Sequence, residues 1–138
     1  MIKISFLIFY LITSLITIAQ NADEIIGKYH LPNKLDIEIF KDGDSFSGKI
    51  IALNNFDDGQ TKDVNNPEDT KQNDPLLGMV IIHNLKFDEE KKQWLNGKMY
   101  GPEKGMIFNL KITDMLQKQI EVVGSKYFFW RTMKWDKI

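Results

Sequence analysis

The 138-residue sequence contains no cysteine, only two histidines and only four prolines. Without cysteine the chain can form no disulfide, and it cannot carry a lipid-anchored cysteine behind a signal sequence. An excess of charge of one sign is lacking too, since 18 basic side chains stand against 19 acidic ones. With no basic cluster, there is no electrostatic basis for nucleic-acid binding. The chain must therefore hold together by its hydrophobic core alone.

The first 19 residues have the layout of a secretory signal peptide. Lys3 provides a positive charge, and Ile4–Ile18 is apolar apart from hydroxyl residues and one tyrosine. Thr17 and Ala19 then offer small side chains before a cleavage site. The apolar run is shorter than the roughly 20 residues of a membrane-spanning helix, so an uncleaved anchor is the less favoured alternative. We expect an exported protein, periplasmic or secreted, that is cleaved after residue 19.

Residues 20–138 form the expected mature domain. Without Lys3 it has 17 basic and 19 acidic side chains, a net charge of −2. A domain of this size buries roughly two thirds of its unfolded surface, which is enough for a core without metals or disulfides. It contains no second long apolar segment and no basic amphipathic helix. We therefore expect one exported domain with no stable membrane insertion after cleavage of the signal peptide.

Alternating apolar and polar residues predict β-strands throughout this domain. The clearest signal is a hairpin, in which the runs Trp94–Tyr100 and Met106–Thr113 flank the turn Gly101–Gly105. No segment has a convincing helical period. Eight mostly sequential antiparallel strands favour a closed up-and-down barrel, because closure removes exposed strand edges. The predicted strands cover residues 24–30, 35–39, 46–53, 76–83, 93–100, 106–113, 119–124 and 128–135.

One long loop, residues 54–75, interrupts the regular spacing of the predicted strands. It is rich in Asn, Asp, Gln and Thr, and it contains six acidic residues against two lysines. A loop of this length within a small domain is usually functional or else locally disordered. We expect it to act as a lid or rim beside a binding site.

Three groups of residues, taken in order, resemble the bacterial secreted family catalogued as domain of unknown function 2147. The resemblance extends over essentially the whole mature chain. It implies export and a single small β-barrel, and it implies no established activity. The residues that carry it are Asp63–Pro67 with Pro75–Gly78, Trp94 with Asn96–Pro102, and Arg131–Thr132 with Trp135.

A looser resemblance is to lipocalin-like barrels. Gly27-Lys28-Tyr29 resembles the Gly-x-Trp that opens the first strand of such barrels, and Arg131 lies on the predicted last strand. In these barrels an arginine of the last strand packs over the first-strand aromatic ring and closes one end. The resemblance implies that Tyr29 and Arg131 form this cation–π contact, worth about 0.5–2 kcal/mol, and that their role is structural and not catalytic.

The strand before the hairpin turn offers a candidate ligand-binding face. In a regular strand Trp94, Asn96, Lys98 and Tyr100 share one face, which combines flat apolar area with hydrogen-bonding groups. Pointed inward, this face would line a pocket for a ligand with an acidic or polar head. Pointed outward, it would be an ordinary solvent-exposed face, with Leu95 and Met99 filling the core instead.

The sequence gives little basis for a metal site, and we predict no metal and no cofactor. His30 and His83 are 53 residues apart and have no His-x-His or cysteine partner. The acidic loop could in principle bind Ca²⁺. However, Asp57-Asp58-Gly59 lacks the alternating ligand spacing of a Ca²⁺-binding loop, so a solvated acidic loop is the favoured interpretation.

No catalytic residue is predicted either, because Ser45, Ser47 and Ser125 lack a nucleophile-elbow context and no phosphate-binding glycine loop is present. Our first hypothesis is therefore a barrel that binds a small, partly apolar ligand or an envelope component. The alternative is a protein–protein interaction module of the cell envelope with a side-chain-filled barrel. The sequence leaves the oligomeric state open. The side chains expected to fill the interior in the alternative are Phe46, Ile50, Phe108, Leu110 and Ile120.

Overall fold

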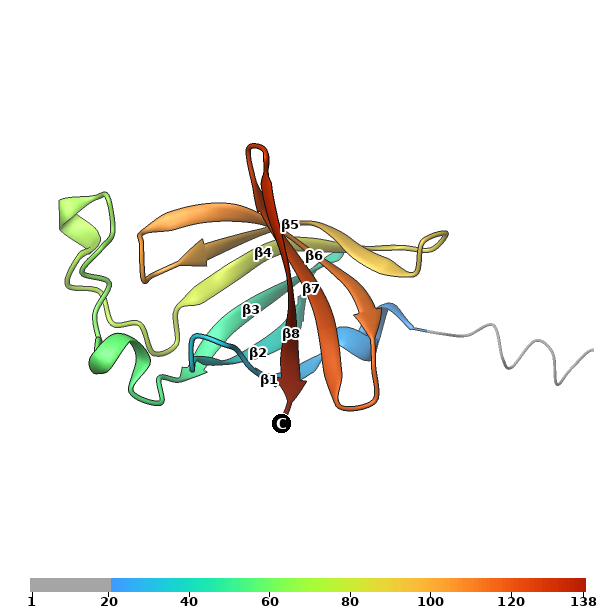
Figure 1. Cartoon of the computed structure of the whole chain (residues 1–138), viewed down its shortest axis with the longest axis horizontal. Coiled ribbons are helices and arrows are strands. Elements are labelled where there is room, and N and C mark those ends of the chain that lie inside the picture. Colours follow the sequence, from blue (N-terminus) through green and yellow to red (C-terminus); the bar gives the residue numbers. More distant parts are fainter. Residues whose placement is uncertain (1–20) are drawn as a thin grey trace, which may run out of the picture.

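Eight antiparallel strands follow one another in chain order around a closed barrel (Figure 1). This computed structural model describes residues 21–138, so the predicted signal peptide lies outside the described residues. Each strand pairs with its neighbours in sequence, and the last strand closes the barrel on the first. The predicted up-and-down barrel is thus confirmed. The strands are β1 (Gly27–His30), β2 (Asp36–Asp42), β3 (Ser45–Ala52), β4 (Val80–Asp88), β5 (Gln93–Gly101), β6 (Met106–Met115), β7 (Gln119–Lys126) and β8 (Phe129–Lys137).

Two predicted strands begin later than their apolar residues suggest. The first was expected from residue 24, but Ala22–Ile25 form the 3₁₀ turn η1, and β1 starts at Gly27. The fourth was expected from Leu76, which instead accepts a turn hydrogen bond from the backbone N–H of Met79. Both Ile25 and Leu76 are fully buried. The apolar character of Ile25 and Leu76 therefore indicates burial in the core and not strand conformation.

The barrel interior is filled by side chains that alternate inward along the strands. On β7, for example, Ile120 and Val122 are buried while their neighbours are partly exposed. Of the five residues considered as interior fillers, four are buried, and Phe108 packs half-buried against them. The buried four are Phe46, Ile50, Leu110 and Ile120.

The two ends of the barrel differ. At one end η1 covers the core, because the Trp94 Nε1–H donates to the carbonyl of Ala22 at 2.9 Å. The Tyr29 hydroxyl donates to the carbonyl of Ile25 at 2.7 Å and fixes the same turn. We call this the closed end. The turns β1–β2, β5–β6 and β7–β8 gather at the opposite end together with residues 53–79, and we call that the open end.

The long loop is folded against the barrel. It contains two short 3₁₀ turns, η2 (Phe56–Asp58) and η3 (Asp69–Lys71), and an isolated bridge between Lys62 and Pro75. Phe56 is buried in the core and anchors the start of the loop. Within residues 21–138, no helix is long and apolar enough to cross a membrane.

Candidate functional site

A β-bulge in β5 divides the predicted ligand-binding face. Asn96 has φ 65°, and the pairing with β6 shifts between Trp94, opposite Ile112, and Gly97, opposite Leu110. An extra residue in one strand reverses which side chains point inward beyond it. Trp94 therefore points inward, whereas Lys98 on the far side of the bulge points outward. The prediction that the four residues share one face is wrong.

The four residues consequently occupy three different places. Trp94 is buried and packs against Phe87, with ring centroids 4.9 Å apart. Asn96 is exposed at the bulge. Lys98 and Tyr100 come together on the outer face of β5 beneath the long loop. The Asn96-Gly97 dipeptide within an otherwise regular strand was the signal for the bulge, because Asn tolerates positive φ and Gly permits close backbone approach.

Lys98 and Tyr100 line a cleft of about 640 Å³ between the long loop and the outer faces of β4, β5 and β6. We call it the loop cleft. Its strand wall combines cationic and apolar side chains, and its loop wall contains carboxyl groups. Sequence reasoning missed most of these residues, because strand pairing brings the strand-wall residues together and only the folded loop adds the second wall. The main strand-wall residues are Val80, His83, Lys98, Tyr100, Met106, Ile107 and Lys126, and the charged loop residues are Asp63, Glu68, Lys71 and Asp74.

A buried carboxyl group fastens the loop to the strands. The Tyr100 hydroxyl donates to Asp63 Oδ1 at 2.6 Å, and Asn66 Nδ2 donates to Asp63 Oδ2 at 2.8 Å. Asp63 is only 1% exposed. Burial, followed by the hydrogen bond to Asp63, raises the pKa of Tyr100 above its ordinary value. The hydroxyl therefore stays protonated and remains a donor across the physiological range.

A second fastening joins the loop to the β5–β6 turn. Asn65 Nδ2 donates to the carbonyls of Pro102 and Glu103 at 3.2 and 3.1 Å. Gly105 passes so close to the loop that an added Cβ would lie 1.9 Å from the Asn65 carbonyl oxygen. The cleft therefore has a fixed wall on the loop side.

Two lysines of the strand wall have only neutral hydrogen-bond acceptors. Lys98 Nζ donates to Asn109 Oδ1, and Lys126 Nζ donates to the carbonyl of Ile107 at 2.9 Å. Neither belongs to an ion pair among residues 21–138. An ammonium group has three donors, so each retains capacity for a further acceptor. On the loop wall, by contrast, Glu68 pairs with Lys71 at 3.4 Å.

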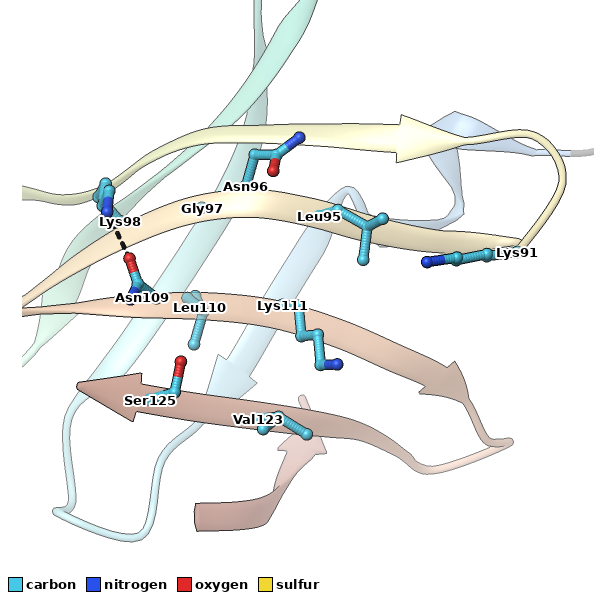
Figure 2. A pocket seen from close by; sticks show the side chains of 10 residues that line it. All are labelled: Lys91, Leu95, Asn96, Gly97, Lys98, Asn109, Leu110, Lys111, Val123 and Ser125. Carbon is cyan, nitrogen blue, oxygen red and sulfur yellow. Dashed lines mark hydrogen bonds between the residues drawn. The ribbon is translucent and has the colours of Figure 1, made fainter. Parts of the chain in front are cut away.

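A second hollow, the outer groove, lies across the outer faces of β5, β6 and β7 and has a volume of about 480 Å³ (Figure 2). Lys98 and its partner Asn109 lie at one end and Lys91 at the other. Asn96 lines this groove and not the loop cleft. Lys98 lines both, so the two hollows adjoin at its side chain.

A third hollow of about 290 Å³ opens at the open end of the barrel. We call it the mouth cavity. Met99, Phe108 and Trp135 contribute apolar surface to it. Glu103 and Arg131 add one charge of each sign, and they form no ion pair with each other.

The predicted contact between Tyr29 and Arg131 is absent. Tyr29 pairs with Lys137 across the β1–β8 junction, six residues along β8 from Arg131. Arg131 instead pairs with Gly124 and lies exposed at the mouth cavity. Because β8 runs from the open end to the closed end, its first residues lie far from η1. The closed end is held by Tyr29 and Trp94, and the prediction for Arg131 is wrong.

The two histidines lie apart. His30 Nδ1 lies 2.5 Å from Asp36 Oδ1 on the neighbouring strand, whereas His83 is on the outer face of β4 in the loop cleft. Among the residues that the structure describes, no group of three or more His, Asp or Glu side chains is arranged to hold a metal ion.

Comparison with known proteins gives a family and a fold. The model of a family described as "Uncharacterized protein conserved in bacteria (DUF2147)" matches residues 14–137. No curated protein matches the chain. Among solved structures, protein HP1028 from Helicobacter pylori, described as belonging to the lipocalin family, is similar with a TM-score of 0.73. The match covers 83% of each chain at 20% sequence identity, so it establishes a lipocalin-like fold and nothing about a ligand.

Proposed function

Since the chain belongs to the DUF2147 family of bacterial proteins and folds as a lipocalin-like barrel, we propose that it binds a small, partly apolar molecule with an acidic group. We place the binding site for this molecule in the loop cleft. The proposal includes export to the periplasm or the exterior, which rests on the sequence of residues 1–19. It includes no catalytic step.

The observation that carries the proposal is that two ammonium groups with remaining donor capacity lie beside exposed apolar side chains in the same cleft. Lys98 and Lys126 point into the loop cleft with neutral acceptors only, beside the exposed side chains of Met106 and Ile107. A carboxylate or phosphate would receive charge-assisted hydrogen bonds from the lysines. The apolar part of the same molecule would cover the methionine and isoleucine. The cleft volume lies within the range of small-molecule sites.

The centre of the barrel is a poorer place for the ligand. Residues such as Ile50 and Leu110 already fill it. The hollows described above lie at the mouth and outside the sheet. We therefore place the ligand outside the barrel wall, with the loop as its fixed rim.

A fluorescent fatty acid, cis-parinaric acid, tests this proposal. We expect saturable binding to the protein and weaker binding of the uncharged methyl ester. Lys98→Gln should weaken binding of the acid by about tenfold, the scale of one charge-assisted hydrogen bond. Lys111→Gln is the matched control, because Lys111 lines the outer groove and not the loop cleft. Equal affinity for acid and ester, or equal losses in both variants, would contradict the proposal.

The filled interior also favours a second candidate, a protein–protein interaction module of the cell envelope that uses the long loop as its contact surface. Native mass spectrometry of the protein purified from its own host separates the two. A retained small-molecule mass that Lys98→Gln abolishes supports ligand binding. A polypeptide that co-purifies repeatedly, with no small molecule retained, supports the second candidate.

A further inference from the structure

The turn between β7 and β8 presents four consecutive aromatic side chains to solvent. Residues Tyr127 to Trp130 are each between 75% and 90% exposed. Figure 1 shows this hairpin projecting beyond the barrel, at the top of the view, apart from the green and yellow-green long loop at the left. Single exposed apolar residues are common on protein surfaces, but a contiguous exposed aromatic patch marks an interaction site.

The aromatic residues at this turn contribute little to the fold, apart from Tyr127, whose ring centroid lies 5.5 Å from Lys126 Nζ in an exposed cation–π contact. Their exposure means that the four side chains contribute almost no burial to the core. Tyr127 moreover has φ 55°, a left-handed conformation that Gly or Asn would adopt at lower cost. The aromatic character of the tip therefore requires an explanation outside folding.

The hairpin is also locally cationic. Between residues 124 and 135 the charged side chains are Lys126, Arg131 and Lys134, and no acidic residue occurs. This contrasts with the net charge of −2 expected for residues 20–138 and with the acidic long loop. Aromatic rings flanked by cations match the boundary between lipid headgroups and acyl chains, where Trp and Tyr concentrate and basic residues meet anionic phosphates.

The apolar surface extends from the tip onto the barrel. Lys126 Nζ donates to the carbonyl of Ile107 at 2.9 Å, which places Ile107 beside the hairpin. Ile107 is 58% exposed and its neighbour Met106 is 43% exposed. These side chains enlarge the patch beyond the four aromatic residues.

The patch borders the mouth cavity. A hollow of about 250 Å³ beneath the hairpin is lined by Phe129 and Trp130. Phe108, Arg131 and Met133 line both this hollow and the mouth cavity. A surface bound by the hairpin would therefore lie next to the open end of the barrel.

We propose that the tip of the β7–β8 hairpin, Tyr127–Trp130 with Lys126 and Arg131, docks reversibly onto the surface of a phospholipid bilayer that contains anionic lipids. The aromatic side chains enter the headgroup region and the two cations contact lipid phosphates. Contact is peripheral, and it turns the open end of the barrel toward the lipid. Lys126, Met106 and Ile107 also line the loop cleft, so the patch adjoins the proposed ligand site. Docking of the aromatic tip does not require a bound ligand and stands whether or not ligand binding occurs.

Trp130 provides a site-specific signal. It is 75% exposed, whereas Trp94 and Trp135 are buried, so a change of solvent at the hairpin alters the emission of Trp130. Vesicles of phosphatidylethanolamine and phosphatidylglycerol should shift the emission to the blue, and brominated acyl chains should quench it. This readout does not respond to membrane attachment through the apolar residues Ile4–Ile18, should these be retained.

Two variants and a control complete the experiment. Phe128→Ser with Phe129→Ser should weaken vesicle partitioning, measured by the Trp130 shift, at least tenfold. Lys126→Gln should weaken it on anionic vesicles and leave it unchanged on purely zwitterionic ones. Ile138→Ser is the matched control, since Ile138 is an exposed apolar residue at the closed end.

The outcomes are distinct. A blue shift with quenching that the double variant abolishes and the control retains supports the proposal. Unchanged Trp130 emission with every vesicle composition overturns it. A concentration-dependent dimer in sedimentation, lost in the double variant and formed without any vesicle response, would overturn it in favour of a contact between two copies of the chain.

Discussion

The Tyr100 hydroxyl donates to the buried Asp63 carboxyl group at 2.6 Å and so joins two residues that are 37 positions apart. A buried carboxyl group is costly unless hydrogen bonds compensate it. Here Tyr100 and Asn66 supply one bond to each oxygen. The polar contacts at buried Asp63 therefore help to position the long loop on the barrel, together with the bonds from Asn65 to the β5–β6 turn.

Removing the Tyr100 hydroxyl should destabilise the protein. Tyr100→Phe leaves Asp63 Oδ1 buried without this donor, and we expect a loss of about 1–3 kcal/mol in the free energy of unfolding, measured by urea denaturation. Tyr127→Phe is the control, because Tyr127 is exposed and should change stability by less than about 0.5 kcal/mol. Equal stability of the two variants would show that the bond does not hold the loop.

A methyl group at Gly105 should displace the long loop. Gly105 and Gly43 have nearly the same backbone conformation, φ 64° and 66°. At Gly43 an added Cβ meets nothing within 4 Å, whereas at Gly105 it meets the Asn65 carbonyl oxygen at 1.9 Å. Gly43→Ala should cost only the left-handed strain, about 1–2 kcal/mol. Gly105→Ala should cost more and should also make residues 54–75 sensitive to limited proteolysis, and equal effects would contradict the close approach.

The bulge at Asn96 should be sensitive to β-branched residues. At φ 65°, valine is strained, so Asn96→Val should destabilise the barrel by about 1–2 kcal/mol although valine favours strands in general. Asn96→Gly should be tolerated. As a control, Thr132→Val at an exposed position of β8 should be neutral or slightly stabilising. If valine stabilised both positions equally, β5 would be regular and the bulge absent in solution.

Stability should fall at alkaline pH in a way that depends on Tyr29. Burial raises the pKa of Tyr29 from 10.0 to about 12. Between these values the unfolded chain loses the phenol proton and the folded chain keeps it, so stability is full below pH 10 and declines as the pH rises towards 12. The slope from one such group is at most about 1.4 kcal/mol per pH unit.

Urea midpoints measured from pH 9 to 11 check this expectation. Tyr29→Phe lowers stability at all pH values, because the bond to the Ile25 carbonyl is lost, but its decline with pH should be shallower than that of the unaltered protein. Tyr100, whose pKa is also raised, contributes a residual decline in the same direction. Parallel curves would contradict the burial effect at Tyr29.

The closed-end residues illustrate how far sequence resemblance can assign roles. The resemblance to lipocalin-like barrels implied a structural role for Tyr29, whose buried hydroxyl donates to the carbonyl of Ile25. It failed for Arg131, because the role depends on which end of the last strand carries the arginine, and β8 extends six residues from Arg131 to the partner of Tyr29. Strand length and register, which are tertiary properties, decided the difference.

The sequence by itself determined the barrel. Alternating apolar residues define which face of each strand is buried. Eight such strands, joined by short turns apart from one long loop, pair the backbone groups of their edge strands when the barrel closes. The tertiary structure alone decided the site. One extra residue at Asn96 reversed the faces of β5. The folding of residues 54–75 onto the sheet then set Asp63 against Tyr100 and enclosed Lys98 and Lys126 in one cleft. The alternation of apolar and polar residues is a local property that can be read directly from the sequence. The bulge and the loop contacts instead depend on packing and hydrogen bonds between segments that are distant in the sequence.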